Sequence, residues 1–162
     1  GRPLLTERQF FKRPQISVKD SFPHTFGDNW REVQRIYYKL YEEVHLKFLL
    51  PLPGARDLLA HLKRNNVYMA LVSNKNGNFL RKEVEFLNWK DYFGAIVGSS
   101  DAESDKPSSL PVKLALGSIE GISSKDVLFV GDSMLIFSVH AIQDVLLLLW
   151  VDYDPLKTNP RI

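Results

Sequence analysis

The length and composition of the chain are those of an ordinary globular protein. Its 162 residues are 44% hydrophobic and 25% charged, carry a formal net charge of +2 and include no cysteine. This length suits one domain, or one core with a small appendage, and the lack of cysteine excludes disulfides and thiolate chemistry. No basic run with interleaved aromatic residues indicates a nucleic-acid groove. We therefore expect a cytoplasmic protein that does not bind nucleic acid.

Hydrophobic runs in the chain are short. The longest aliphatic run covers residues 145–151, far below the ~20 residues that a membrane-spanning helix needs. The N-terminus lacks the apolar central region of a signal peptide. We therefore expect no membrane partner.

Residues 1–51 have a helical pattern. After a short helix expected over 16–22, Asp28 is placed to cap a helix whose apolar positions, between Trp30 and Phe48, recur at steps of three and four. This wide aromatic stripe favours packing against other helices. His45 has no metal-ligand spacing to another histidine or to a carboxylate, and we expect it on the helix surface.

The sequence Pro51-Leu52-Pro53-Gly54 marks a boundary, after which short apolar runs alternate with helical patterns. The expected strands are 67–72, 95–97, 127–130 and 145–151, and the helices between them include 79–87, 112–116 and 134–142. Strands that are apolar throughout and separated by helices indicate a parallel sheet with both faces covered. The predicted fold class is therefore α/β, in which ligands bind beyond the carboxyl ends of the strands.

Ser73 and Asn74 follow the expected strand 67–72. A hydroxyl and free backbone N–H groups at the start of a helix can bind phosphate, because the first-turn N–H groups lack partners and the helix dipole is positive there. The same residue types are also typical of a helix N-cap. From these residues alone both interpretations stay open.

Two further residues could handle phosphate. Lys106 precedes Pro107 in an expected loop, where an ammonium could neutralise a phosphoryl oxygen or orient a carboxylate nucleophile. A solvated surface lysine is the alternative. Asp132 follows an apolar strand and Gly131, and a carboxylate at such a strand end can bind Mg²⁺. The alternative for Asp132 is again a helix cap.

Four segments, taken in order, resemble the haloacid dehalogenase-like (HAD) superfamily of phosphatases, and within it the phosphoglycolate-phosphatase-like proteins. They are PGARDLL at 53–59, ALVSNK at 70–75, DKP at 105–107 and FVGDS at 129–133. The resemblance implies a Rossmann-like core over residues 52–162, with helices on both faces of a parallel sheet. It also implies that residues 1–51 form a partial helical cap.

The resemblance further implies a mechanism. In this family an aspartate on the first strand attacks phosphorus to form an aspartyl-phosphate, and Mg²⁺ bridges nucleophile and phosphate. By resemblance, Ser73 and Asn74 bind phosphate, Lys106 binds phosphate and acts in catalysis, and Asp132 holds Mg²⁺. The implied substrate is a small phosphorylated metabolite.

Two departures from the family pattern bear on activity. The family's opening Asp-x-Asp segment has no counterpart in this sequence, and no acid follows Asp132 before Asp144. We therefore expect a phosphatase chain without its first strand, truncated or inactive as given. Self-association or a complementing N-terminal segment would cover the open sheet. A non-catalytic pseudoenzyme that binds a partner or a phosphorylated ligand is the alternative, and a receiver-like signalling domain fits less well.

Overall fold

The structure is a computed structural model that describes residues 16–117, 128–130 and 146–148. The helices are α2 (Val18–Phe26), α3 (Trp30–Val44), α4 (Ala55–Arg64), α5 (Gly77–Phe86) and α6 (Leu110–Leu116), with 3-10 turns η1 (Gly27–Asn29) and η2 (Lys90–Tyr92). The strands are β1 (Ala70–Asn76), β2 (Ala95–Ser99), β3 (Leu128–Val130) and β4 (Leu146–Leu148). None of the helices in these ranges combines the length and apolar character needed to cross a bilayer.

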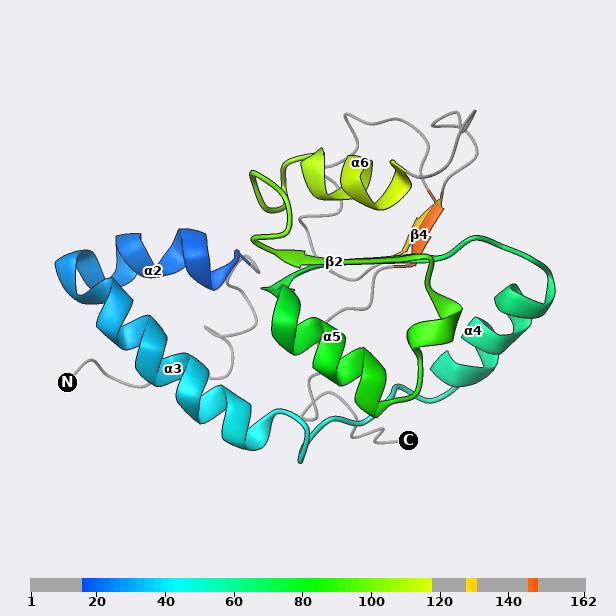
Figure 1. Cartoon of the computed structure of the whole chain (residues 1–162), viewed down its shortest axis with the longest axis horizontal. Coiled ribbons are helices and arrows are strands. Elements are labelled where there is room, and N and C mark those ends of the chain that lie inside the picture. The colour runs from blue at the N-terminus through cyan, green and yellow to red at the C-terminus, as the bar shows by residue number, and fades with distance from the viewer. Residues whose placement is uncertain (1–15, 118–127, 131–145, 149–162) are drawn as a thin grey trace, which may run out of the picture.

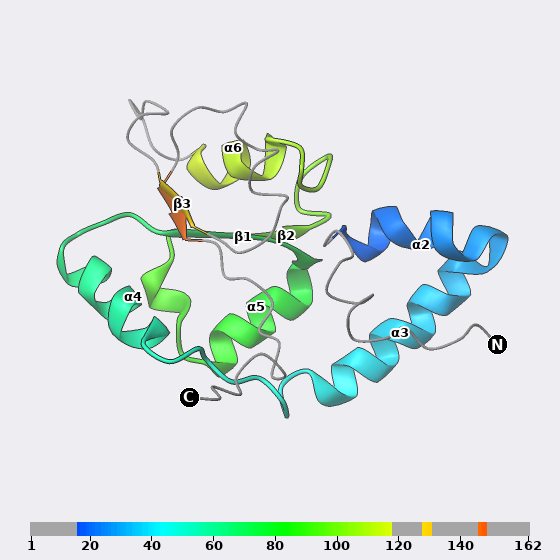
Figure 2. The ribbon, with the colours of Figure 1, turned by 180° about the vertical axis from the view of Figure 1, so that it is seen from behind.

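The strands form two parallel pairs. β1 pairs with β2, with Ala70 opposite Ala95, and β3 pairs with β4, with Leu128 opposite Leu146. Helix α6 lies on one side of the β1–β2 pair, and α4 and α5 lie on the other (Figures 1 and 2). The predicted α/β class, with a parallel sheet and helices on both faces, is confirmed.

Apolar side chains from both helical layers bury the sheet. Leu71 of β1 packs in one cluster with Leu59 of α4 and Leu80 of α5, and none of the three exceeds 3% exposure. On α6, Val112 and Ala115 are fully buried. Burial of a leucine-sized side chain contributes about 1.5–3 kcal/mol, so this two-sided core holds β1 and β2 in place.

The helices before the sheet differ in detail from expectation. Ser17 caps α2 by accepting a hydrogen bond from the Asp20 N–H at 3.2 Å. Pro23 lies inside α2 rather than ending it, at the cost of one intrahelical hydrogen bond. Asp28 does not cap the next helix, because it lies within the 3-10 turn η1 and α3 begins two residues later.

Part of the apolar stripe of α3 packs on the sheet layer and part of it is exposed. Leu40 is 57% exposed and Phe48 is 70% exposed. Tyr41 of the stripe contacts the Phe79 ring of α5 at a centroid distance of 5.1 Å, and the His45 ring, which does not belong to the stripe, contacts it at 5.0 Å. The expectation of a surface His45 is therefore wrong: its side chain is buried because Glu83 offers it a hydrogen-bond partner inside the contact.

Candidate functional site

The end of β1 carries the first two candidate residues. The pairing of β1 with β2 loses its register between Val72 and Asn76, so Ser73 and Asn74 lie within the irregular end of the strand and not after it. Helix α5 follows, and the Asn76 side chain accepts a hydrogen bond from the Asn78 N–H at 3.0 Å. Asn76 is therefore the N-cap, and the capping interpretation of Ser73 is wrong.

The Ser73 hydroxyl is half-buried at this irregular strand end. Its oxygen accepts a hydrogen bond from the Lys75 N–H at 3.1 Å. A hydroxyl offers one proton and two lone pairs, so this bond leaves the proton of Ser73 able to donate. Such a donor at the carboxyl end of a parallel strand is suited to a phosphoryl oxygen.

Asn74 joins β1 to the loop that carries Lys106. Its side-chain Nδ2 donates to the Lys106 carbonyl at 2.9 Å, and its Oδ1 accepts from the Lys106 N–H at 3.0 Å. This reciprocal pair satisfies both backbone groups of one residue. The Asn74 side chain thus positions Lys106, and direct binding of phosphate by Asn74 stays a prediction.

Lys106 is a buried lysine with only 8% of its surface exposed. Its ammonium donates to the Val72 carbonyl at 3.1 Å, one residue before Ser73. The surface-lysine interpretation is therefore wrong. An ammonium held away from bulk water interacts strongly with a nearby anion, and Ser73 and Lys106 meet at the same end of β1.

Asp105 anchors the other end of the Lys106 loop. Its carboxylate accepts hydrogen bonds from the Ser99 hydroxyl at 2.6 Å and from the Ser100 N–H at 3.0 Å, and only 5% of the residue is exposed. The sequence motif included Asp105, yet nothing in its spacing assigned it a role. Its contacts fix the loop to the end of β2.

Tyr38 of α3 is a residue near the site that the sequence did not single out. Burial raises the pKa of its phenol, a hydrogen bond with Asn76 opposes that rise, and the Asp105 carboxylate adds to it. The tyrosine therefore lies close to both the end of β1 and the Lys106 loop. The periodicity of the sequence does not indicate Tyr38, because Tyr37 and Tyr41 fit the apolar stripe and Tyr38 does not.

The predicted metal ligand, Asp132, lies outside the described residues. Within the described ranges, no three histidine or acidic side chains gather as a group that could hold a metal ion. Asp105 is engaged with Ser99 and Ser100. The described residues therefore do not by themselves form a Mg²⁺ site, and the assignment of Asp132 stays a prediction.

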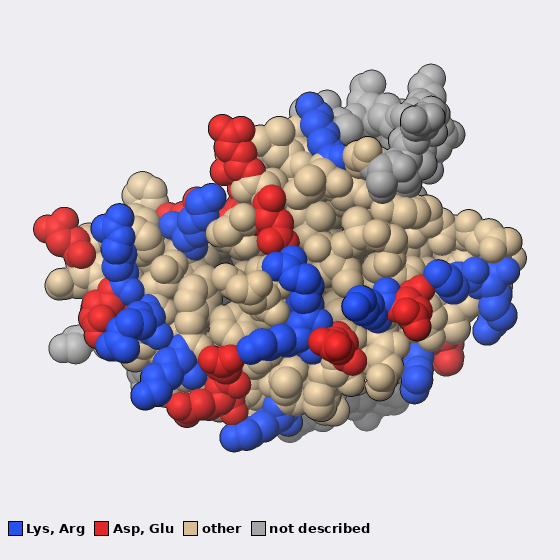
Figure 3. Space-filling view, in the orientation of Figure 1, with Lys and Arg blue, Asp and Glu red and all other residues tan. Residues whose placement is uncertain are grey.

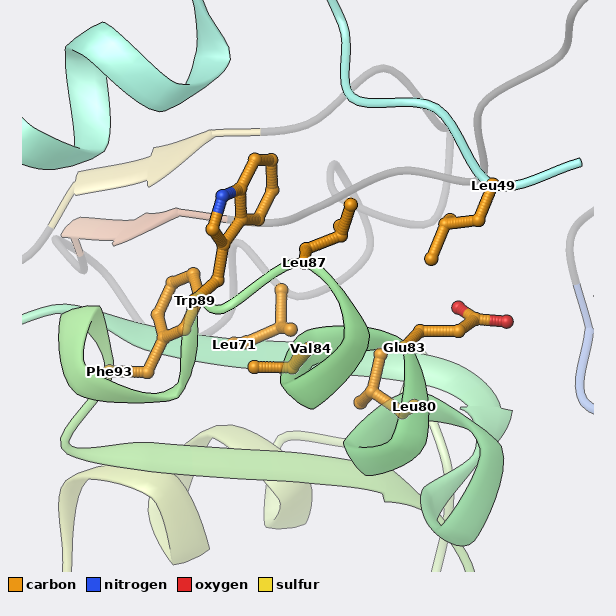
Figure 4. A pocket seen from close by; sticks show the side chains of 8 residues that line it. All are labelled: Leu49, Leu71, Leu80, Glu83, Val84, Leu87, Trp89 and Phe93. Atoms are coloured by element: carbon orange, nitrogen blue, oxygen red, sulfur yellow. The ribbon is translucent and has the colours of Figure 1, made fainter. Parts of the chain in front are cut away.

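A hollow on the α5 side of the sheet is separate from these residues (Figure 4). Apolar side chains dominate its lining, among them Leu71, Trp89 and Phe93, and Glu83 is the charged residue of the set. The Glu83 carboxylate points away from Trp89 and Phe93. Ser73, Asn74 and Lys106 do not line this hollow, which is part of the packing core and offers no convergent polar groups.

Comparison with known proteins identifies the class. Residues 3–138 match the haloacid dehalogenase-like hydrolase family. Together with the parallel sheet and the placement of the DKP loop beside Ser73, this match means that the chain belongs to that family of hydrolases. The resemblance drawn from the four sequence segments is confirmed.

The curated relatives that the chain matches include phosphoglycolate phosphatases. The chain is 28% identical over 128 residues to a phosphoglycolate phosphatase of Escherichia coli, an alignment that covers 79% of this chain and 49% of the relative. It is 32% identical over 119 residues to a phosphoglycolate phosphatase of Neisseria gonorrhoeae, covering 74% and 50% respectively. The matched region thus spans about half the length of these relatives.

Two solved structures have the same fold. A HAD-superfamily hydrolase from Ehrlichia chaffeensis is 36% identical with a TM-score of 0.55, covering 80% of this chain and 64% of that one. A HAD-superfamily hydrolase from Geobacter sulfurreducens is 22% identical with a TM-score of 0.63, covering 90% and 70%. The second likeness concerns the fold alone.

Proposed function

We propose that the chain serves Mg²⁺-dependent hydrolysis of a small phosphate monoester, of the phosphoglycolate kind, in the cytoplasm. The observation that supports this most is the buried Lys106, held by Asn74 beside the Ser73 hydroxyl at the end of β1. A phosphate monoester carries negative charge on several oxygens, and a hydroxyl donor next to a desolvated ammonium complements that charge.

Each described residue has a distinct part in this proposal. The Ser73 hydroxyl donates to one phosphoryl oxygen, and the Lys106 ammonium neutralises negative charge on the phosphoryl group. In the proposed reaction this group passes first to an aspartate that lies outside the described residues, with release of the alcohol, and then to water, as the family likeness implies. Asn74 holds Lys106 in place through its backbone. Asp132 is proposed as a Mg²⁺ ligand on the family likeness alone, and the roles of Ser73, Asn74 and Lys106 do not depend on the metal.

A second candidate function is phosphate binding without turnover. Both Asp105 oxygens accept hydrogen bonds, so this acid is not placed to attack phosphorus. The segment Met134 to Phe137 after Asp132 contains no acid. These two observations favour a chain that binds a phosphorylated ligand but turns it over slowly or not at all by itself.

An assay of the chain with phosphoglycolate and a generic phosphate ester, with and without Mg²⁺, tests both candidates. Lys106→Ala should lower turnover at least about 10³-fold, because it removes a charge that stabilises the transition state, and Asp132→Asn should lower Mg²⁺-dependent turnover to background, because it removes the proposed metal ligand. Lys113→Ala, an exposed lysine on α6, serves as the matched control.

The results separate the candidates as follows. Mg²⁺-dependent turnover that falls in both site variants supports the phosphatase. Phosphate binding, followed by ³¹P NMR, that needs Lys106 but gives no turnover supports the binding function. Turnover unaffected by Lys106→Ala would rule out the site described above.

A further inference from the structure

A buried carboxylate on α5 joins three structural elements away from the proposed phosphate contacts. Glu83 is 3% exposed. Its Oε1 accepts hydrogen bonds from the Tyr41 hydroxyl at 3.0 Å and pairs with Nδ1 of His45 at 2.9 Å, and its Oε2 accepts from the Lys75 ammonium at 2.6 Å. Tyr41 belongs to α3, His45 directly follows it, and Lys75 belongs to β1. Glu83 thus connects α3 to β1.

Aromatic rings pack around this polar cluster. The Tyr41 ring stacks on His45 with centroids 5.1 Å apart at 18°. Phe79, one turn before Glu83 on α5, meets both rings edge-on at 5.1 and 5.0 Å. A buried charge destabilises the fold unless it is paired and hydrogen-bonded. Glu83 therefore favours the one position of α3 in which its partners all reach it.

The same cluster reaches the candidate phosphate site by two routes. Lys75, whose ammonium Glu83 holds, donates its backbone N–H to the Ser73 hydroxyl. On α3, Tyr38 lies one turn before Tyr41, and its ring contacts Phe79 of α5 at a centroid distance of 5.5 Å. The Asn76 side chain at the end of β1 acts to lower the pKa of its phenol. A shift of α3 would move Tyr38, and release of Lys75 would disturb the backbone that holds Ser73.

We propose that Glu83 is a positioning residue, which fixes α3, and with it Tyr38, against the end of β1. Glu83 would position the phosphate site of the proposed function, so an effect of Glu83 on catalysis rests on that proposal. The way in which Glu83 holds α3 does not rest on it. An experiment without ligand can therefore test it.

Hydrogen exchange of the full chain, measured by mass spectrometry, distinguishes positioning from general stabilisation. Glu83→Gln keeps the size of the side chain and removes its charge. In Glu83→Gln we expect the exchange rate of α3 amides, relative to that of β1 amides, to rise about tenfold to a hundredfold. This is the change that results when hydrogen bonds to a charged group are lost. Glu85→Gln, an exposed neighbour on α5, should leave that ratio unchanged.

Two results would overturn the proposal: equal acceleration in α3 and β1, which marks a merely stabilising residue, or no change at all. If Glu83→Gln does not fold, Tyr41→Phe gives the same comparison while Glu83 keeps His45 and Lys75. A selective acceleration of α3 of about threefold or more is then expected, and its absence counts against the proposal.

Inorganic phosphate provides the readout at the site. If Glu83 positions the site, phosphate should bind at least about fivefold more weakly to Glu83→Gln than to Glu85→Gln. Equal binding to both would overturn the positioning of the site. If the unaltered chain binds no phosphate, the proposed function fails, whereas the exchange ratio still decides whether Glu83 positions α3.

Discussion

Lys106 is one of 21 lysines and arginines in the chain, and the described structure sets it apart by burial. Lys106 is 8% exposed, its ammonium donates to the Val72 carbonyl, and its backbone N–H donates to Asn74. A buried ammonium destabilises the fold unless it has hydrogen-bond partners. The contacts around Lys106 therefore hold its ammonium at the end of β1, where the proposed phosphate ligand would lie.

Asn74→Ala should lower the free energy of unfolding by about 1–3 kcal/mol, because it leaves the N–H and the carbonyl of Lys106 without their partners in a partly buried loop. Chemical denaturation measures this change. Asn65→Ala is the control, since Asn65 also bonds a backbone carbonyl, that of His61 at 2.8 Å, but at an exposed site. Equal losses in the two variants would contradict a special role for the Asn74 contact.

At the scale of elements, α3 and α5 also meet through an exposed ion pair. Lys82 of α5 donates to Glu42 of α3 at 2.6 Å. The hydrogen bond from Lys82 and its charge hold the pKa of Glu42 below its ordinary value of 4.5. A lowered carboxyl pKa stabilises the fold above about pH 4.5, and this contribution is lost as the pH falls through the lower folded value.

Lys82→Met should therefore raise the pKa of Glu42 toward 4.5, which an NMR titration of the carboxyl resonances can follow. Glu32 provides an internal control on the same helix, because Arg35 lowers its pKa through a local contact. The Glu32 titration should not move in the variant. An unchanged Glu42 titration would show that the α3–α5 ion pair does not form in solution.

The approach of β2 to the start of α5 depends on Gly98. A side-chain carbon there would lie 2.6 Å from the Gly77 nitrogen and 2.8 Å from the Lys75 carbonyl oxygen, both backbone atoms that move only with β1 and α5. Gly98→Ala should therefore destabilise the chain by about 3 kcal/mol. Thermal unfolding compares it with Gly117→Ala, whose nearest neighbour is 3.3 Å away and whose effect should stay below about 1 kcal/mol.

On the surface of the molecule, a row of apolar side chains on α3 is exposed to solvent. Charged residues of both signs are interspersed over the face shown in Figure 3, whereas Ile36, Leu40 and Val44, spaced four apart, are 46%, 57% and 41% exposed. Phe48 extends this row at 70% exposure. An apolar patch of this kind favours association.

We therefore expect the chain to self-associate, and the Leu40→Gln/Phe48→Gln variant to be less associated because its surface is more polar. Sedimentation velocity over a range of concentrations measures this. Leu114→Gln, a 51% exposed leucine on α6, is the control and should associate like the unaltered chain. A monomeric unaltered chain that unfolds cooperatively at high temperature would contradict the expectation.

The fold class, the family and most of the element order follow from local patterns in the sequence. Its apolar runs at 95–97 and 127–130 became β2 and β3, because a buried parallel strand must be apolar on both faces. The sequence also indicates the motif residues Ser73 and Lys106, since their chemistry and their place in short motifs are local properties of the chain.

The side chains that surround these residues are set by tertiary packing. The sequence pattern predicts a surface position for His45 and does not indicate Tyr38. Both nevertheless contact α5, because Glu83 and Phe79, about forty residues away, determine which face of α3 packs. Periodicity ranks helix faces by hydrophobicity alone, whereas a buried carboxylate selects the face that can donate hydrogen bonds to it. That choice depends on long-range contacts, which no local pattern in the sequence contains.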